Sequence, residues 1–248
     1  MAQPDVQHLE PADGPRLAYR LRSGGEPTLV FLPGYASDMD GAKAQALDSF
    51  AEGRGLGLLR FDYSGTGLSG GRFEDGTLGR WLDETLLMID RLTEGPLVVV
   101  GSSMGGWLAL HAALRRPDRV AALVGIAAAP DFTEWGFGPE ERARLERDGR
   151  IERANPYGPP QITTAGFWRS GQALRLLQDP IAIDCPVRLL HGERDEDVPL
   201  AIAFRSMAAL RSADVQLTVV KGGGHRLSER HEINAILGAV AALVEPLR

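Results

Sequence analysis

Residues 97–114 have the sequence Leu-Val-Val-Val-Gly-Ser-Ser-Met-Gly-Gly-Trp-Leu-Ala-Leu-His-Ala-Ala-Leu. The apolar start of this stretch predicts a buried strand and its end predicts a helix, so that the residues between them form a tight turn. Within the turn, Gly101–Gly105 matches the pattern G-x-S-x-G, whose serine is exposed on a strained strand-to-helix connection. Such a turn directs the N–H of Met104, at the helix N-terminus, toward a developing oxyanion. The stretch therefore predicts a nucleophile at Ser103.

A second glycine-rich stretch, Gly-Thr-Gly-Leu-Ser-Gly-Gly at 65–71, matches two competing patterns. The dinucleotide-binding pattern G-x-G-x-x-G also needs a helix that opens at its third glycine and an acidic residue about 20 residues further on. Here helical spacing begins only after residue 76, and the next strand ends without an acid. The same stretch places Ser69 in a second G-x-S-x-G, but without the strand and helix of an elbow. We therefore predict a sharp loop and no nucleotide cofactor.

Short β-rich runs alternate with longer helical patterns along the chain. Strands are predicted at 28–32, 58–62, 97–101, 120–126, 187–191 and 215–220, and helices at 40–52, 78–93, 103–115, 199–211 and 228–246. Several strand runs are continuously apolar, which is typical of a sheet that helices cover on both faces. The alternation predicts an α/β fold with a mostly parallel, doubly wound sheet. The first 25 residues could add an antiparallel hairpin at the edge.

The stretch 131–184 interrupts this alternation, because it shows no strand pattern and is too long for a connecting loop. It contains a charged helical pattern at 139–149, a proline-rich stretch at 155–160 and a second helical pattern near 163–178. We expect residues 131–184 to form an inserted helical cap or lid, and residues 1–130 and 185–248 to form the core.

The expected cap holds six of the 16 aromatic residues: Phe132, Trp135, Phe137, Tyr157, Phe167 and Trp168. They form either the roof of an apolar pocket or the cap's own small core, because a packing surface and a pocket wall need the same residue types. The candidates for substrate binding are Trp135, Phe137, Phe167 and Trp168.

A serine nucleophile needs a general base, and the base needs an acid that orients it. Of the five histidines, His225 follows the last predicted strand in a glycine-rich loop that reaches the carboxyl edge of the sheet, where the sites of open α/β sheets lie. His191 ends a strand and is expected in the core. Asp195 follows that strand, and Asp131, after the preceding strand, is the alternative acid. The chain order Ser103, Asp195, His225 favours Asp195.

Composition excludes several classes of protein. The net charge is −6 and the pI about 5.4, which argues against a nucleic-acid partner. Glycine supplies 30 of 248 residues, but 44% of the chain is hydrophobic, which excludes disorder and collagen. The single Cys185 can form neither an internal disulfide nor a metal cluster. The N-terminal segment shows no leader pattern, so we expect a cytoplasmic location. The uncharged run 95–114 has a glycine-rich centre, which predicts two short buried elements rather than a membrane span.

Four stretches resemble the α/β-hydrolase superfamily: FLPGYASDMDGAKA at 31–44, RFDYSGTGLSGG at 60–71, GSSMGGWLALHAALRRPDRVAALVGIA at 101–127 and CPVRLLHGERDEDVP at 185–199. Within it they are similar to the animal mitochondrial palmitoyl-protein thioesterases, also described as acyl-glucuronide esterases. The resemblance implies the same nucleophile, acid and base. It also implies that the backbone N–H of Tyr35 is the second oxyanion donor. The chain departs from the subgroup at Gly222–Gly224, in its N-terminal segment and in the cap, which leaves the substrate open.

These features predict a serine hydrolase without metal or cofactor, which cleaves carboxylic esters or thioesters of a small molecule or an acylated protein through an acyl-enzyme. A carbon–carbon bond hydrolase or a perhydrolase with the same triad is an alternative. A ligand receptor without catalytic activity, built on the same scaffold, is another alternative from a different class. The oligomeric state is not indicated by the sequence.

Overall fold

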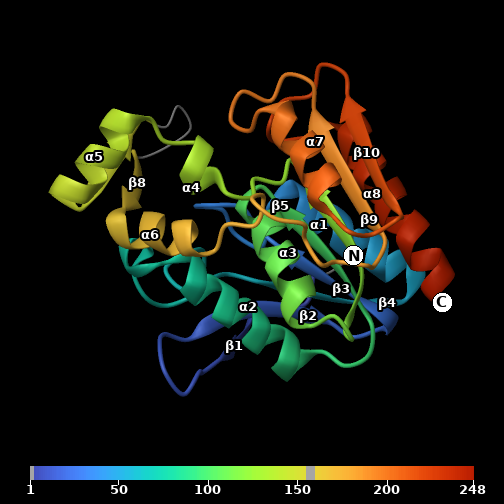
Figure 1. The fold of residues 1–248 in the computed structure, drawn as a ribbon. Helices are drawn as coiled ribbons and strands as arrows, with labels where there is room; N and C mark the ends of the chain where they lie inside the picture. Colours follow the sequence, from blue (N-terminus) through green and yellow to red (C-terminus); the bar gives the residue numbers. More distant parts are fainter. Residues whose placement is uncertain (1–2, 155–159) are drawn as a thin grey trace.

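The computed structural model describes residues 3–154 and 160–248, and its main feature is an eight-stranded sheet flanked by helices (Figure 1). The strands lie in the order β1-β2-β4-β3-β5-β6-β9-β10. Their bounds are β1 Gln7–Leu9, β2 Leu17–Arg22, β3 Gly25–Leu32, β4 Leu56–Phe61, β5 Leu97–Ser102, β6 Val120–Ile126, β9 Val187–Gly192 and β10 Val215–Val220. The strand β2 runs antiparallel to β1 and β4, and the other pairs are parallel. The predicted mostly parallel sheet and its N-terminal edge hairpin are confirmed.

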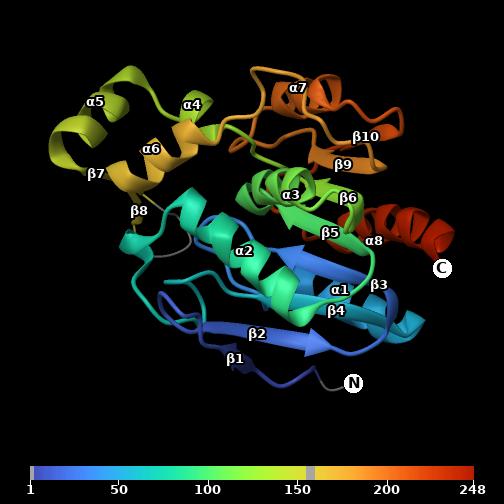
Figure 2. The ribbon, with the colours of Figure 1, turned by 60° about the horizontal axis from the view of Figure 1, so that its bottom comes forward.

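Helices cover both faces of the sheet (Figure 2). The helices α2 (Leu78–Leu92) and α3 (Met104–Arg115) pack on one face, and α1 (Ala42–Arg54) and α8 (Arg230–Val244) pack on the other. A further helix, α7 (Leu200–Ala209), packs against β9 and β10. Each lies within a few residues of its predicted position, so the doubly wound architecture is also confirmed.

The sequence of strand β5 has no alternation of polar and apolar residues because both of its faces are buried. Leu97 and Val99 face the layer of α2 and α3, whereas Val98 and Val100 face the layer of α1 and α8, and all four are fully buried. At the end of the strand, Gly101 pairs with Leu32 of β3 and with Gly125 of β6. The central parallel strands therefore end at one edge of the sheet, and Ser103 lies just beyond it.

The chain between β6 and β9 forms a separate group of elements beside the sheet (Figure 1). They are α4 (Phe132–Trp135), α5 (Pro139–Asp148), β7 (Arg150–Arg153), β8 (Gln161–Thr164) and α6 (Ala165–Ala173). The predicted absence of strands here is wrong, because β7 and β8 form an antiparallel pair. Each has four residues and one aliphatic side chain, which is too little for an apolar strand pattern. The division into core and cap stays a prediction, and 155–159 of the proline-rich stretch lie outside the described residues.

The uncharged run 95–114 is divided between β5 and α3, as its glycine-rich centre predicted. Among the described residues, no helix combines the length and the apolar character that crossing a bilayer requires.

Candidate active site

The turn between β5 and α3 has the geometry of a nucleophile elbow. Ser103 has φ 54° and ψ −119°, a conformation that is rare for a residue with a side chain and stores strain at a functional turn. A Cβ added to Gly101 would lie 2.2 Å from the carbonyl oxygen of Gly105, and one added to Gly105 would lie 2.1 Å from that of Leu32. Only glycine fits these two positions, so the G-x-S-x-G pattern follows from the close approach of the backbone.

Ser103, His225 and Asp195, which lie far apart in the sequence, are joined by hydrogen bonds. The Oγ of Ser103 lies 3.0 Å from Nε2 of His225, and Nδ1 of the same ring lies 2.9 Å from Oδ2 of Asp195. Asp195 lies in the loop after β9, and His225 lies in the loop after β10. Both loops leave the carboxyl ends of parallel strands, which explains how they meet the elbow. The structure thus brings the three predicted residues together.

The surroundings of Asp195 keep its carboxyl group ionised. Its side chain is fully buried, and Oδ1 accepts hydrogen bonds from the N–H groups of Asp197 at 3.0 Å and Val198 at 2.8 Å. Burial alone would raise the pKa of Asp195, but the hydrogen bonds from His225 and Val198 more than offset it, so that the pKa lies below its usual value. An ionised carboxylate at this place can fix the imidazole tautomer and stabilise the imidazolium.

The alternative residues have other partners. Asp131 is fully buried and accepts hydrogen bonds from the N–H groups of Leu176 and Leu177, each at 2.8 Å. His191 is 1% exposed, as predicted for a core histidine, and its Nε2 lies 2.8 Å from the carbonyl oxygen of Val198 and 3.4 Å from Oδ2 of Asp195. Because Asp195 already bonds to Nδ1 of the imidazole at the elbow, the geometry favours Asp195 over Asp131.

The two expected oxyanion donors belong to segments that border Ser103. Met104 is the first residue of α3, and the N–H groups of a first helical turn have no partner within the helix. Tyr35 follows Gly34, where an added Cβ would lie 3.3 Å from the Cβ of Ser103. The loop after β3 thus passes directly beside the elbow, which is compatible with an oxyanion site between the two N–H groups.

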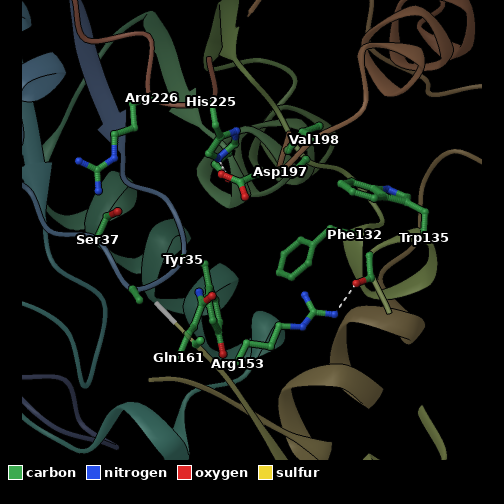
Figure 3. Close-up of a pocket in the computed structure, with 15 residues that line it drawn as sticks. Tyr35, Ser37, Phe132, Trp135, Arg153, Gln161, Asp197, Val198, His225 and Arg226 are labelled. Carbon is green, nitrogen blue, oxygen red and sulfur yellow. Dashed lines mark hydrogen bonds between the residues drawn. The ribbon is translucent and has the colours of Figure 1, made fainter. Parts of the chain in front are cut away.

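Ser103 and His225 line a cavity of about 400 Å³ (Figure 3). The other lining residues are Tyr35, Ala36, Ser37, Ala129, Phe132, Trp135, Gly136, Arg153, Ala154, Gln161, Asp197, Val198 and Arg226. One part of this wall is apolar, with Phe132, Trp135 and Val198, and another part carries polar and charged side chains. The apolar part of the wall suits an apolar portion of a substrate, and the polar part can accommodate polar groups.

Of the four aromatic residues proposed to bind substrate, Trp135 lines the cavity. The other three lie in packed clusters. Phe137 is 4% exposed and packs with Leu145, Phe167 is 1% exposed in the main core, and Trp168 packs beside Phe137. These three positions fit the alternative interpretation, in which the cap aromatics form a core. Tyr157 lies outside the described residues.

The cavity wall also includes Phe132, which was expected only as one of the cap aromatics, and Arg153 and Gln161, which were not predicted. The guanidinium of Arg153 donates to both carboxylate oxygens of Glu141, at 2.8 and 2.7 Å, and lies over the ring of Phe137. Arg153 belongs to β7 and Gln161 belongs to β8. Because neither strand was predicted, the position of these two residues at the cavity could not be predicted either. The period-two pattern of Arg-Ile-Glu-Arg at 150–153 was the available signal.

The glycine-rich stretch 65–71 forms a loop that closes on Asp62. The carboxylate of Asp62 accepts the N–H of Leu68, and the hydroxyl of Ser69 donates to the Asp62 carbonyl at 2.6 Å and accepts the N–H of Ala18. The 3-10 helix η1 (Phe73–Asp75) follows, and α2 begins only at residue 78. This arrangement is the predicted sharp loop, in which Ser69 has a structural role.

Asp195, Asp197 and His225 are the group of potential metal ligands found within the described part of the chain, with ligand atoms within 4.8 Å of one another. Two of these residues already hydrogen-bond to each other through Oδ2 and Nδ1, and Asp197 is exposed. The geometry is that of a carboxylate that orients an imidazole. That the site needs no metal stays a prediction.

Known proteins resemble this chain in sequence and in structure. The alpha/beta hydrolase fold family matches residues 27–145. The human mitochondrial palmitoyl-protein thioesterase ABHD10 is 38% identical over 98% of this chain and 81% of its own length. Among solved structures, mouse alpha/beta hydrolase domain-containing protein 10 has a TM-score of 0.92 and 36% identity, covering 98% of this chain and all of that one. A protein from Agrobacterium vitis S4 described as a hydrolase has a TM-score of 0.91 and 38% identity, covering 97% of this chain and 98% of that one.

The expectation of a cytoplasmic location is wrong by these comparisons, because the curated relatives that match 98% of the chain are mitochondrial proteins. That expectation relied on the composition of the N-terminal segment, which does not identify a compartment. The resemblance that the sequence indicated is confirmed over almost the whole length of the chain. Together with the strand order and the turn at Ser103, the sequence identity to these relatives shows that the chain belongs to the α/β-hydrolase family.

Proposed function

We propose that this chain is a serine hydrolase that cleaves carboxylic esters or thioesters through an acyl-enzyme intermediate. The observation that supports it is the hydrogen-bonded series from Ser103 Oγ through the His225 ring to Asp195, at the wall of a cavity. A free hydroxyl is a weak nucleophile, and an adjacent imidazole held by a buried carboxylate removes this limit.

In the first half of the reaction, His225 Nε2 takes the hydroxyl proton of Ser103 while Oγ attacks the acyl carbonyl carbon. The carbonyl oxygen becomes an oxyanion, and the N–H groups of Tyr35 and Met104 donate to it. The tetrahedral intermediate then collapses, the bond to the leaving group breaks, and an alkoxide takes the proton from His225. A thiolate is a better leaving group and needs little of this acid assistance.

In the second half, a water molecule gives a proton to His225 and attacks the acyl-enzyme carbonyl. The same two N–H groups accommodate the oxyanion, and His225 returns the proton to Ser103 as the carboxylic acid leaves. Asp195 stays ionised throughout and holds the imidazole in the tautomer that each step requires.

The substrate we propose has an apolar acyl part. The apolar wall of the cavity, with Phe132, Trp135 and Val198, is suited to such a group. The curated relatives are named palmitoyl-protein thioesterases, which supports an acylated protein or a small acyl ester or thioester as the substrate. In this proposal residues 131–184 act as a cap over the acyl chain.

The test uses a fluorophosphonate probe and a chromogenic acyl ester on Ser103→Ala and Ser69→Ala. We expect Ser103→Ala to lose labelling and to lose several orders of magnitude in kcat. Ser69→Ala is the matched control, since Ser69 lies in the other G-x-S-x-G but bonds to backbone groups, and it should still label. Wild-type turnover by Ser103→Ala contradicts the assignment, and ligand binding without turnover by the wild type favours a receptor.

A series of acyl esters and matched thioesters, from two carbons upward, tests the substrate class. We expect kcat/KM to rise with chain length until the acyl group fills the cavity. Activity confined to chains below about four carbons would reject the long acyl substrate and would leave the serine mechanism intact, since every acyl ester uses the same triad.

A further inference from the structure

The side chain of Tyr35 crosses from the loop after β3 to the group of elements between β6 and β9. Its hydroxyl donates to the carbonyl oxygen of Ile162 in β8 at 2.8 Å. Burial raises the pKa of Tyr35 to about 12, so the hydroxyl keeps its proton and stays a donor at neutral pH. This hydrogen bond ties the side chain to β8.

The ring of Tyr35 contacts aromatic residues on both sides of the same boundary. Ring centroids lie at 5.0 Å for Phe73 and 5.9 Å for Trp81, which precede β5 in the chain. They lie at 6.0 Å for Phe132 and 4.7 Å for Phe167, which belong to α4 and α6. Because rings at these distances pack in fixed relative orientations, the Tyr35 ring cannot move independently of either group.

The same residue also touches the reaction centre. The Gly34–Tyr35 segment lies against Ser103, and the backbone N–H of Tyr35 is the second oxyanion donor of the proposed function. On the other side, Phe132 and Gln161 line the cavity together with Tyr35 (Figure 3). An acyl group that presses against Phe132 or β8 therefore acts on the position of Tyr35.

We propose that the Tyr35 side chain is a positioning residue that couples the occupied acyl cavity to the oxyanion N–H of the same residue. Contacts with a long acyl chain fix the positions of β8 and α4. These two elements hold the ring and the hydroxyl of Tyr35. The ring in turn holds the backbone N–H of Tyr35 where it can donate to the oxyanion. Binding of a long acyl chain therefore raises kcat, because the hydrogen bond from the Tyr35 N–H to the oxyanion is completed only when the cavity is filled. This inference rests on the proposed serine hydrolase function.

The test measures kcat and KM separately for short and long acyl esters in Tyr35→Phe, which keeps the ring and the backbone N–H but removes the hydroxyl. We expect the ratio of kcat for the long ester to kcat for the short ester to fall about fivefold, the effect of one hydrogen bond.

Tyr19→Phe is the control, since its hydroxyl also donates, to Oε1 of Gln7 at 2.9 Å, and it lies on β2, next to the edge strand β1. It should leave the ratio unchanged. Equal losses of kcat for both esters in Tyr35→Phe, or a change in KM alone, would overturn the proposal. Amide hydrogen exchange of 150–153 and 161–164 gives a second measurement, and exchange as slow as in the wild type would also overturn it. Failure of the wild type to react with a fluorophosphonate would instead refute the serine hydrolase function.

Discussion

Replacing Asp195 with Asn tests the orientation of the imidazole, because the structure predicts which way the new amide turns. Oδ1 of Asp195 accepts two backbone N–H groups, so the amide oxygen of Asn takes that position. The amide NH₂ then takes the position of Oδ2, 2.9 Å from Nδ1 of His225. It donates to Nδ1 and forces the proton onto Nε2, which faces the Ser103 hydroxyl at 3.0 Å. In this tautomer Nε2 cannot accept the hydroxyl proton.

The expected loss in kcat follows from this tautomer change. An equivalent substitution in a serine protease triad lowers kcat about 10⁴-fold, which corresponds to roughly 5.5 kcal/mol in the activation free energy. The two backbone hydrogen bonds to the retained oxygen survive, so the fold should lose only about 1–3 kcal/mol, the cost of one poorly matched buried group. The change in kcat should thus far exceed the change in stability.

The assay is hydrolysis of an acyl ester near neutral pH, with thermal unfolding measured on the same samples. Asp131→Asn is the matched control, since Asp131 is equally buried and also accepts two N–H groups, but from Leu176 and Leu177. It should lower stability and keep kcat within about tenfold of the wild type. Retention of a tenth of the wild-type kcat by Asp195→Asn, or loss of activity in Asp131→Asn instead, would show that Asp195 does not set the tautomer of His225.

Three further predictions concern the elbow, the cavity and pH. Gly105→Ala places a Cβ 2.1 Å from the Leu32 carbonyl oxygen. It should lower the free energy of unfolding, measured with urea, by about 1–3 kcal/mol or more. Phe132→Ala should raise KM and lower kcat for long acyl esters, whereas Phe137→Ala, in a packed cluster, should mainly lower the unfolding free energy, by about 3–5 kcal/mol. Folding depresses the pKa of Asp195. The ionised carboxyl group therefore stabilises the folded state fully at pH values above its usual pKa of 3.8, and this stabilisation is lost at lower pH. The unfolding free energies of wild type and Asp195→Asn should therefore converge on acidification from about pH 7 to about pH 3.

The fold could be predicted because the strongest sequence signals are local. The run Leu97–Val100 is apolar on both faces since each face is covered by helices, and this condition leaves a continuous pattern that is easy to recognise. The elbow is equally local, since Gly101 and Gly105 are required by backbone contacts within a few residues and with the neighbouring strand. Strand order and elbow together limit where the loops of Asp195 and His225 can lie.

The apolar part of the cavity wall could not be predicted in the same way, because a cavity wall and a hydrophobic core are built from the same residue types. Phe132 and Phe167 are both phenylalanines of one segment, with ring centroids 5.7 Å apart, yet Phe132 lines the cavity and Phe167 is 1% exposed in the main core. Which of two neighbouring rings faces a cavity depends on the helix crossing and on the β7–β8 pair. That pair is held by short polar strands, whose pattern is too weak to identify.

Two buried polar side chains, those of Asp131 and His111, bind the same short stretch of backbone. The carboxylate of Asp131 accepts the N–H groups of Leu176 and Leu177, and Nε2 of His111 lies 2.8 Å from the carbonyl oxygen of Leu174. Both side chains thus bind the backbone of 174–177, where the chain leaves α6 to return toward the sheet. A buried acid after β6 and a buried histidine on α3 fix this return, while Asp195 and His225 reach the elbow. With Tyr35 bonded to β8 as well, the segment between β6 and β9 is held at two places, one at the start of α4 and one at β8 beside the cavity.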